Sequence, residues 1–339
     1  MRTLRVTAVT FLLFQVAFAQ WQMQQPGVDT ELRGLSAVSA KIVWASGSKG
    51  TILRTVDGGQ HWQKLSTPET QGLDFRDIQG FDANTAYVLS IGPGNQSRIY
   101  KTVDGGQHWD LQFSNSNPEA FYDCFAFWDS HHGFALSDSI EGVFPVLSTD
   151  DGQSWYVQPS YMPAALAKEG GFAASGTCTA AFGKNDGWFA TGGPAARVFH
   201  TTDQGETWTV AATPILSGAA SQGIFSVAFW SAKEGVAVGG DYQNPKNGER
   251  TAAITSDGGR SWKLSEKPPA MYCSAVAVLS GGRSPRLLAV GTAGSSISND
   301  GGRTWSADSQ TGFNALSCAE GVCFAAGSRG RIAARSITP

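Results

Sequence analysis

Short apolar runs recur along the chain and are separated by polar stretches rich in glycine, aspartate and serine. Each run spans four to six residues, and most end in glycine or serine. Runs of this length bounded by turn-forming residues predict β-strands rather than helices. Seven such runs can be recognised, at residues 43–47 (VWASG), 87–90 (YVLS), 134–137 (FALS), 188–193 (WFATGG), 236–240 (VAVGG), 288–292 (LAVGT) and 323–327 (CFAAG).

A polar octapeptide of the form Ser/Thr-x-Asp-x-Gly-x-x-Trp follows each of the first six runs. TVDGGQHW occurs at 55–62 and again, letter for letter, at 102–109, and successive octapeptides begin 43 to 54 residues apart. This period is typical of a four-stranded propeller blade. The four further octapeptides occupy residues 148–155, 201–208, 255–262 and 298–305.

The residue types of the octapeptide predict a hairpin turn with a structural role. Aspartate accepts hydrogen bonds from amides further along a turn, glycine adopts positive φ, and a tryptophan ring can be buried between neighbouring blades. A calcium loop would need more oxygen ligands than one aspartate per turn supplies. The expected turn residues are Asp57, Asp104, Asp150, Asp203, Asp257, Asp300, Trp62, Trp109, Trp155, Trp208, Trp262 and Trp305.

The seventh run is not followed by an octapeptide, so its outer strand must come from elsewhere. WQMQQ at 21–25 looks like the strand that follows each octapeptide, with Trp21 in the place of the octapeptide tryptophan. We therefore expect the N-terminal strand to complete the last blade, which removes open sheet edges. The prediction is an all-β protein: one domain over residues 20–339 that forms a seven-bladed β-propeller of four-stranded antiparallel blades, with the ring closed by the N-terminal strand.

Residues 1–19 have the pattern of a secretory signal peptide. Two arginines precede an apolar stretch that ends in Ala-Phe-Ala, and cleavage is expected before Gln20. The stretch is too short and too interrupted for a membrane span. We expect export to a periplasm or to the extracellular space. The rest of the chain holds 23 basic and 28 acidic side chains, and so small an excess gives no footprint for nucleic acid.

Five cysteines in an exported chain leave at least one unpaired within a monomer. Cys318 and Cys323 flank a predicted hairpin turn, AEGV, and a bridge across it is geometrically reasonable. The pairing of Cys124, Cys178 and Cys273 stays open: Cys124 and Cys178 can occupy equivalent strands of neighbouring repeats, but isolated buried thiols are common. No spacing of Cys or His predicts a metal site, and we expect no cofactor.

Recognition is expected on the propeller face opposite the octapeptide turns. The longest irregular segments, 159–176, 214–223 and 241–250, belong to that face, and loops on a rigid scaffold commonly carry binding. Neutral insertion is the alternative.

Arg33 and Arg76 occupy equivalent positions at the starts of the first two inner strands. They could bind carboxylates, or each could simply pair with a neighbouring acid. The candidate binding residues are Arg33, Arg76, Asp77, Arg98, Tyr122 and Asp123.

The octapeptides resemble the Asp-box, or BNR, repeat of sialidases and other propellers, which marks the hairpin between the third and fourth strands and is not specific for an activity. The stretch 47–62, preceded by VWASG, resembles the repeat of the photosystem II stability/assembly factor family, and this resemblance extends over nearly all of the mature chain. It implies a seven-bladed, exported or lumenal, non-enzymatic scaffold, here expected as a monomer, that binds an immature protein. The loops 159–176 and 241–250 are longer than those of a minimal family blade.

The main alternative is a carbohydrate-active protein, either a sialidase-like glycoside hydrolase or a glycan binder. It predicts two carboxylates about 5–10 Å apart beside the channel mouth. Tyr122, Tyr161 or Tyr242 would form a platform for the sugar. No RIP-like stretch of the sialidases follows Trp21, and no paired acids stand out. A third interpretation is a structural protein of the cell envelope without a dedicated ligand. The sequence favours a binding scaffold over an enzyme.

Overall fold

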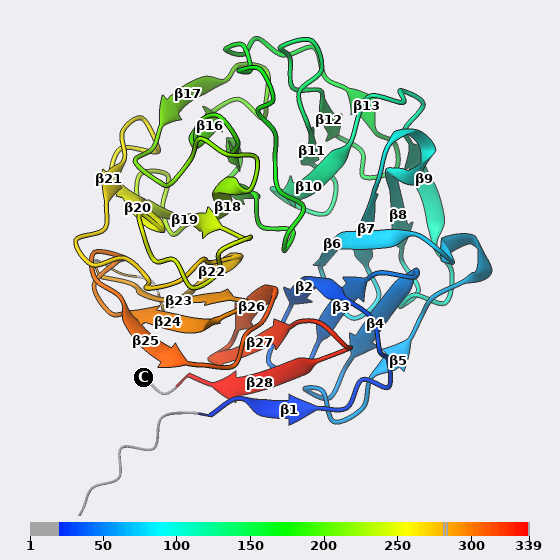
Figure 1. Cartoon of the computed structure of the whole chain (residues 1–339). Coiled ribbons are helices and arrows are strands. Elements are labelled where there is room, and N and C mark those ends of the chain that lie inside the picture. The colour runs from blue at the N-terminus through cyan, green and yellow to red at the C-terminus, as the bar shows by residue number, and fades with distance from the viewer. Residues whose placement is uncertain (1–19, 281, 283, 338–339) are drawn as a thin grey trace, which may run out of the picture.

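Seven four-stranded antiparallel sheets form a closed ring in the computed structural model, which describes residues 20–280, 282 and 284–337 (Figure 1). The expected signal peptide, residues 1–19, lies outside the described residues. The predicted fold class is confirmed. Among the described residues, no helix has the length and apolar character needed to cross a membrane.

Each blade takes four strands in sequence, counted from the channel outwards, except the last. Blades 1 to 3 consist of β2 (Leu32–Ala37), β3 (Val43–Gly47), β4 (Thr51–Thr55) and β5 (Gln63–Lys64); β6 (Asp74–Gly80), β7 (Ala86–Ile91), β8 (Arg98–Thr102) and β9 (Asp110–Ser114); β10 (Tyr122–Phe127), β11 (Gly133–Ser137), β12 (Val146–Thr149) and β13 (Tyr156–Val157). Blades 4 and 5 consist of β14 (Thr179–Phe182), β15 (Asp186–Ala190), β16 (Arg197–Thr201) and β17 (Thr209–Ala212); β18 (Gln222–Phe229), β19 (Gly235–Asp241), β20 (Ala252–Thr255) and β21 (Lys263–Leu264). Blades 6 and 7 consist of β22 (Ala275–Ser280), β23 (Arg286–Gly291), β24 (Gly294–Ser298) and β25 (Ser306–Ser309); β26 (Ala315–Ala319), β27 (Val322–Ala326), β28 (Ile332–Ser336) and β1 (Gln22–Gln24). Two single-turn 3-10 helices, η1 (Pro68–Thr70) and η2 (Gly94–Gln96), lie in connecting segments.

The seven apolar runs form the second strand of each blade, and these strands are buried on both faces. All five residues of β3 and of β11 are buried, for example. Each blade packs between two neighbours, so both faces of its central strands meet apolar side chains and the sequence reads as a continuous apolar run. In one such layer Trp188 and Val198 of blade 4 pack with Val227 and Ala237 of blade 5.

The octapeptides form the turn between the third and fourth strands, as predicted. In the first turn the Thr55 hydroxyl donates to Asp57 Oδ1 at 2.8 Å, and the amides of Gly59 and His61 donate to Thr55 Oγ1 and Asp57 Oδ1, each at 2.9 Å. These hydrogen bonds, chiefly those from His61, hold the pKa of Asp57 well below its ordinary value. Gly59 has a φ of 88°, a conformation that side-chain-bearing residues resist.

The third turn corrects the sequence-based assignment, because Asp151 rather than Asp150 holds it. Asp151 Oδ1 accepts hydrogen bonds from the amides of Gln153 and Ser154, at 2.7 and 2.9 Å, and from the Thr149 hydroxyl at 3.3 Å. Strand β12 ends at Thr149, which takes the role that Thr55 has in the first turn, and the turn to the tryptophan is one residue shorter. Aligning the motif on its tryptophan therefore selects Asp150, one residue before the aspartate that forms the turn.

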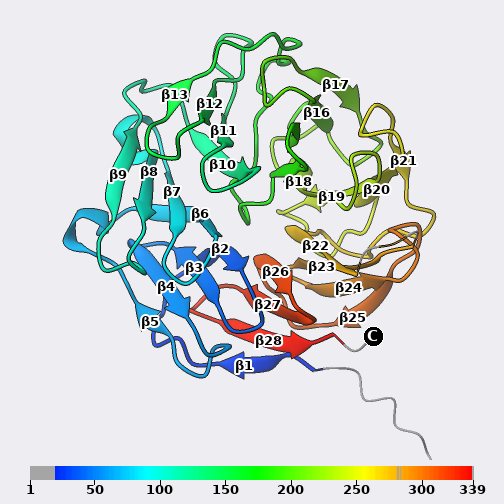
Figure 2. The ribbon, with the colours of Figure 1, turned by 180° about the vertical axis from the view of Figure 1, so that it is seen from behind.

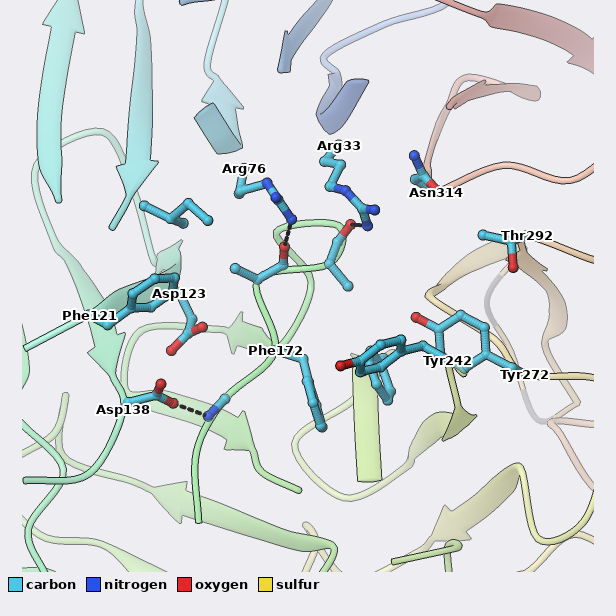
Figure 3. A pocket seen from close by; sticks show the side chains of 15 residues that line it. Arg33, Arg76, Phe121, Asp123, Asp138, Phe172, Tyr242, Tyr272, Thr292 and Asn314 are labelled. Atoms are coloured by element: carbon cyan, nitrogen blue, oxygen red, sulfur yellow. Dashed lines mark hydrogen bonds between the residues drawn. The ribbon is translucent and has the colours of Figure 1, made fainter. Parts of the chain in front are cut away.

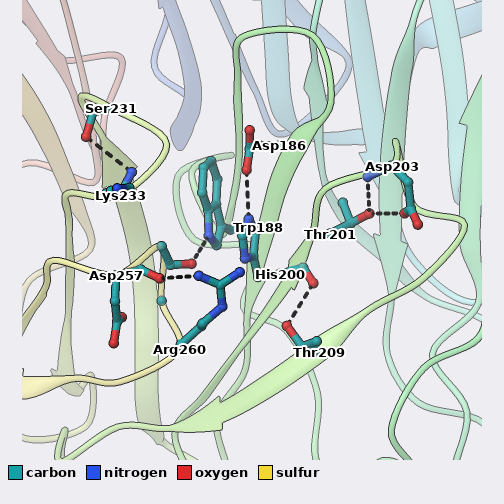
Figure 4. Close-up of polar contacts among 12 residues, drawn as sticks. Asp186, Trp188, His200, Thr201, Asp203, Thr209, Ser231, Lys233, Asp257 and Arg260 are labelled. Carbon is teal, nitrogen blue, oxygen red and sulfur yellow. Dashed lines mark hydrogen bonds and ion pairs between the residues drawn. The ribbon is translucent and has the colours of Figure 1, made fainter.

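The turn tryptophans lie against the preceding blade of the ring to different depths. Trp155, Trp208, Trp262 and Trp305 are buried, whereas Trp62 and Trp109 are half-buried. The blades are also joined through other residues near the turns, as Figure 4 shows for blades 4 and 5. Trp188 Nε1 donates to the carbonyl of Gly258 at 2.8 Å and stacks on His200, whose Nε2 lies 3.0 Å from Asp186 Oδ1.

The N-terminal strand closes the ring, as predicted. Strand β1 pairs antiparallel with β28 and completes blade 7 (Figure 1). Trp21 packs on Phe313, with ring centroids 5.1 Å apart, and the guanidinium of Arg335 lies 5.1 Å above the Trp21 ring. Gln24 extends the closure to blade 1, because its side chain donates to the Gly58 carbonyl and accepts from Trp62 Nε1.

Both candidate disulfides form. Cys318 and Cys323 face each other across β26 and β27, which is the bridge predicted over the AEGV turn. Cys124 of β10 also bonds to Cys178, just before β14, and so ties the inner strands of blades 3 and 4 together. Cys273 remains a buried free thiol.

Candidate functional site

One loop leaves the rim of the propeller and enters its central channel. This channel loop, residues 159–178, connects β13 to β14 and contains the longest of the irregular segments noted in the sequence, 159–176 (Figure 2). Its tip contacts distant blades: the carbonyls of Ala173 and Ala174 accept hydrogen bonds from Arg76 and Arg33, and the Ser175 hydroxyl donates to the Ser274 carbonyl at 2.8 Å. The Cys124–Cys178 disulfide anchors its end.

The channel loop divides the channel into two cavities. The first, of about 420 Å³, lies at the face opposite the octapeptide turns, and we call it the channel-mouth pocket (Figure 3). The second, of about 330 Å³, follows the inner strands further along and is lined by residues such as Asp77 and Ser175. The loops of the recognition face expected from the sequence supply much of the channel-mouth pocket.

Repeated β-bulges aim side chains into the channel-mouth pocket. The pairing of the inner strand with the second strand shifts register at the same place in blades 1, 2, 3 and 5. A bulge leaves one residue unpaired and redirects its side chain. The bulged residues are Arg33, Arg76, Asp123 and Phe225, and all four line the pocket.

The arginine pair predicted from the repeat is present in the pocket, but each arginine already has an acidic partner. Arg33 Nη2 lies 3.2 Å from Glu31 Oε1, and Arg76 donates through Nε and Nη2 to Asp74 Oδ2 at 2.9 and 2.7 Å. Burial, and then the nearby Arg76 charge, lower the pKa of Arg33. The alternative prediction, pairing with neighbouring acids, therefore also holds. These arginines hold the tip of the channel loop and present little unpaired charge.

Two aspartates, Asp123 and Asp138, lie together on the side of the pocket opposite the arginines, and we call them the acid pair (Figure 3). Asp138 Oδ1 accepts the amide of Gly171 at 2.9 Å, the amide of Ala173 faces Asp123, and the two carboxyl groups lie close enough to interact with each other. Burial raises the pKa of Asp138 to about 6, and burial together with the Asp138 charge raises the pKa of Asp123 well above its ordinary value. The acid pair therefore retains a proton near neutral pH.

Aromatic side chains form the remaining wall. Phe172, at the tip of the channel loop, stacks on Phe225 with centroids 3.9 Å apart, and Tyr272 meets Phe225 edge-on at 4.8 Å. Tyr242 lies 6.1 Å from Phe225 and is 48% exposed, so it borders the entrance. Glycines 170 and 171 let the channel loop pass close to the acid pair, because a Cβ at Gly170 would lie 2.1 Å from Asp138 Oδ1 and one at Gly171 would lie 3.0 Å from Asp123 Oδ2.

Three of the predicted binding residues do not line the channel-mouth pocket. Asp77 follows the bulge, points into the second cavity and accepts the amide of Phe125 at 2.9 Å. Tyr122 precedes the bulge in its own strand and is buried edge-on against Phe113. Arg98 donates to the Asn95 carbonyl at 2.6 Å. These three residues lie outside the pocket, and the pocket residues that the sequence did not single out as binding candidates include Asp138, Phe172, Phe225 and Tyr272.

The acid pair does not have the geometry expected of a glycoside hydrolase. Such enzymes need carboxylates about 5 Å or more apart, because a sugar carbon or a water must lie between them. The carboxyl groups of Asp123 and Asp138 instead lie close enough to interact with each other directly. Of the three tyrosines expected as a sugar platform, Tyr242 lines the pocket, while Tyr122 is buried and Tyr161 lies on the outer edge of the ring.

The fold and this pocket define a class of protein: a seven-bladed propeller whose channel is plugged by a loop and whose mouth is lined by aromatic, basic and acidic side chains. The chain is similar in fold to a solved structure described as YCF48 bound to D1 peptide, with 16% identity, a TM-score of 0.62, and coverage of 96% of this chain and 100% of that one. It is also similar to YCF48 from Cyanidioschyzon merolae, with 16% identity, a TM-score of 0.63, and coverage of 94% and 99%. The resemblance to the photosystem II assembly factor predicted from the repeat is confirmed at the level of the fold. Neither a family model nor a curated protein matches the sequence.

Proposed function

We propose that this protein is an exported, non-enzymatic scaffold that binds a segment of a protein partner in the channel-mouth pocket. The observation that carries the proposal is the pocket itself: a concave, largely apolar cavity with several aromatic side chains and a few convergent polar groups, held by four blades of the ring. Support also comes from the fold, which is similar to that of a solved structure described as YCF48 bound to D1 peptide.

The partner and the location follow from the same proposal. A monomeric scaffold with the leader expected at residues 1–19 would meet its partner in a periplasm or outside the cell. A cell-envelope or membrane protein that is still being assembled offers unpaired segments of the kind a pocket can hold. The channel loop sets the depth of this pocket, since its tip forms the floor beside Phe172.

Affinity capture from the cell envelope tests the proposal. Tagged mature protein is compared with Tyr242→Ala, which removes a half-exposed ring from the pocket entrance, and with Tyr161→Ala, which removes an 83% exposed ring outside it. We expect mass spectrometry to identify a partner that is retained by the wild type and by Tyr161→Ala and is depleted at least fivefold by Tyr242→Ala.

A parallel wash with mixed cell-wall glycans separates the alternatives. A partner that survives this wash supports protein recognition. Release by a glycan would favour the carbohydrate interpretation, and equal capture by both tyrosine variants would place the binding surface elsewhere than the channel-mouth pocket.

A further inference from the structure

The acid pair contains a buried acceptor that the protein itself does not satisfy. Asp123 is 2% exposed and faces the Ala173 amide, but its Oδ2 has no hydrogen-bond partner among the described residues. Leaving a buried carboxylate oxygen unpaired is unfavourable, and the loss is recovered when a ligand donates to it. Asp123 lines the channel-mouth pocket, so its carboxyl group borders the space in which a ligand would bind.

The charged side chains around the pocket leave negative charge without a cationic partner. The Glu31 carboxylate balances Arg33, and the Asp74 carboxylate balances Arg76. Asp123 and Asp138 make no ion pair within the described chain, although the Arg76 charge reaches Asp123 from β6. From the channel loop, two backbone amides, those of Gly171 and Ala173, face the acid pair. The acid pair is therefore the uncompensated charge of the pocket.

The aromatic wall suits the body of a basic side chain. Phe172 separates the acid pair from Tyr242 in the pocket (Figure 3). Aromatic faces pack against the aliphatic stem of lysine or arginine and attract its charged head. A side chain that enters past Tyr242 can lay its stem on Phe172 and place its head at Asp123.

We propose that Asp123 and Asp138 form a cation subsite that binds the ammonium or guanidinium group of a lysine or arginine side chain. The group donates a hydrogen bond to the free Oδ2 of Asp123 and neutralises the negative charge of the acid pair. This proposal rests on the proposed function, because it names the residue type that the partner segment would insert.

Two peptide probes test the subsite directly. The fluorescently labelled peptides are Gly-Phe-Lys-Phe-Gly, with blocked ends, and the same sequence with norleucine in place of lysine, which keeps the stem and removes the charge. At pH 7.5 we expect the wild type to bind the lysine peptide at least tenfold more tightly in fluorescence anisotropy, as is typical of a desolvated charged contact. The ratio should fall towards one below about pH 6, where Asp138 gains its proton.

Matched variants identify the residues responsible. Asp123→Asn/Asp138→Asn, which removes both carboxyl groups, should bring the ratio of the two affinities close to one. Asp138→Asn removes the carboxyl group that is ionised at pH 7.5 and provides a second variant should the double variant fail to fold. Asp150→Asn makes a charge change at an exposed residue outside the pocket and should keep the wild-type ratio. Equal affinities for the two peptides, no binding of either at millimolar concentration, or an unchanged ratio in the folded double variant would each overturn the subsite.

Failure of the subsite and failure of the proposed function give different results. If capture of a partner depends on Tyr242 but the wild type does not distinguish the two peptides, the pocket binds a protein without a cationic anchor and the subsite is wrong. If the peptides are distinguished but capture ignores Tyr242, the subsite exists and the proposed function is wrong.

Discussion

Aspartate serves two opposite roles in this protein, and the surroundings of each side chain decide between them. In the octapeptide turns the carboxylate is partly exposed and accepts several hydrogen bonds, which favour the charged form and lower its pKa, as at Asp104 and Asp257. In the acid pair the carboxyl groups are buried beside one another, which disfavours the charged form and raises their pKa. Aspartate thus stabilises the turns in its charged form, whereas at the channel mouth its raised pKa makes the pocket sensitive to pH.

Substitutions in the third turn test whether Asp151 or Asp150 stabilises it. Asp151→Ala removes an acceptor of two backbone amides and should lower the free energy of unfolding by about 1–2 kcal/mol, as the loss of a capping side chain does. Asp150→Ala, at the neighbouring exposed residue, should change it by less than about 0.5 kcal/mol. Urea denaturation followed by tryptophan fluorescence measures both. A larger loss in Asp150→Ala would restore the assignment made from the motif alone.

The acid pair should make stability depend on pH in a defined window. The pKa of Asp138 is raised to about 6 in the folded protein, so the folded state binds more protons than the unfolded state between about pH 4 and 6. This contribution is fully present below about pH 4 and is lost as the pH rises through 6. His200, whose pKa burial lowers, acts in the opposite direction, as its contribution is lost when the pH falls below its unfolded value.

Asp138→Asn isolates this contribution. We expect the variant to lose less stability than the wild type between pH 4.5 and pH 7.5, because asparagine does not titrate. Unfolding by urea at both pH values gives the comparison, and the His200 contribution cancels in the difference. Identical pH dependence of the two proteins would mean that the acid pair does not hold the extra proton.

At the scale of elements, the strands could be predicted because their environment repeats. A second strand packed on both faces needs an unbroken apolar run, and a tight turn needs its aspartate and glycine, so both leave a periodic signal. Arg33 and Arg76 could be found for the same reason, since equivalent bulges place them alike. The course of the channel loop could not, because it is fixed by contacts with Arg76 and Ser274, about 100 residues away in either direction. Asp77 was misplaced because the sequence does not reveal the bulge beside it.

The two disulfides should differ in their effect on stability. Cys124–Cys178 closes 54 residues and Cys318–Cys323 closes 5, so the chain-entropy relation gives about 4 kcal/mol for the first and about 2 kcal/mol for the second. Paired Cys→Ala variants of each bridge, compared by urea denaturation, check this order. Limited proteolysis of the first variant should also cut the channel loop faster, because its anchor is lost. Equal proteolysis of both variants would show that the non-covalent contacts of the loop, such as those with Arg76 and Ser274, hold it without the disulfide.

At the scale of the whole molecule, stability depends on a strand of three residues. Without β1, the edge of β28 is open and Trp21 no longer covers Phe313. Open, flat strand edges pair with other chains. The ring is therefore closed by the pairing of β1 with β28 in blade 7, and we call this junction the seam.

Removal of residues 20–25 tests the seam. We expect a loss of at least about 3 kcal/mol, similar to the loss of one large packed aromatic side chain, together with dimers or aggregates formed through β28. Chemical denaturation and light scattering after size-exclusion chromatography measure the two effects. Met23→Ser, at a 49% exposed residue of β1, serves as the control and should behave like the wild type. A truncated protein that stays monomeric and equally stable would contradict a structural role for the seam.

Closure by the two ends of the chain also sets an order in time. Gln22 pairs with Ala334, so β1 leaves the ribosome some 300 residues before its partner strand exists. At a synthesis rate of roughly 5–20 residues per second, the first strand waits roughly 15 to 60 seconds. Asn314, at the start of the last blade, lines the pocket beside Arg33, so the pocket too is incomplete until the end of translation. Under the function proposed above, a chain that is still being synthesised would lack part of its binding pocket, so partner binding would begin only after the last blade has been made.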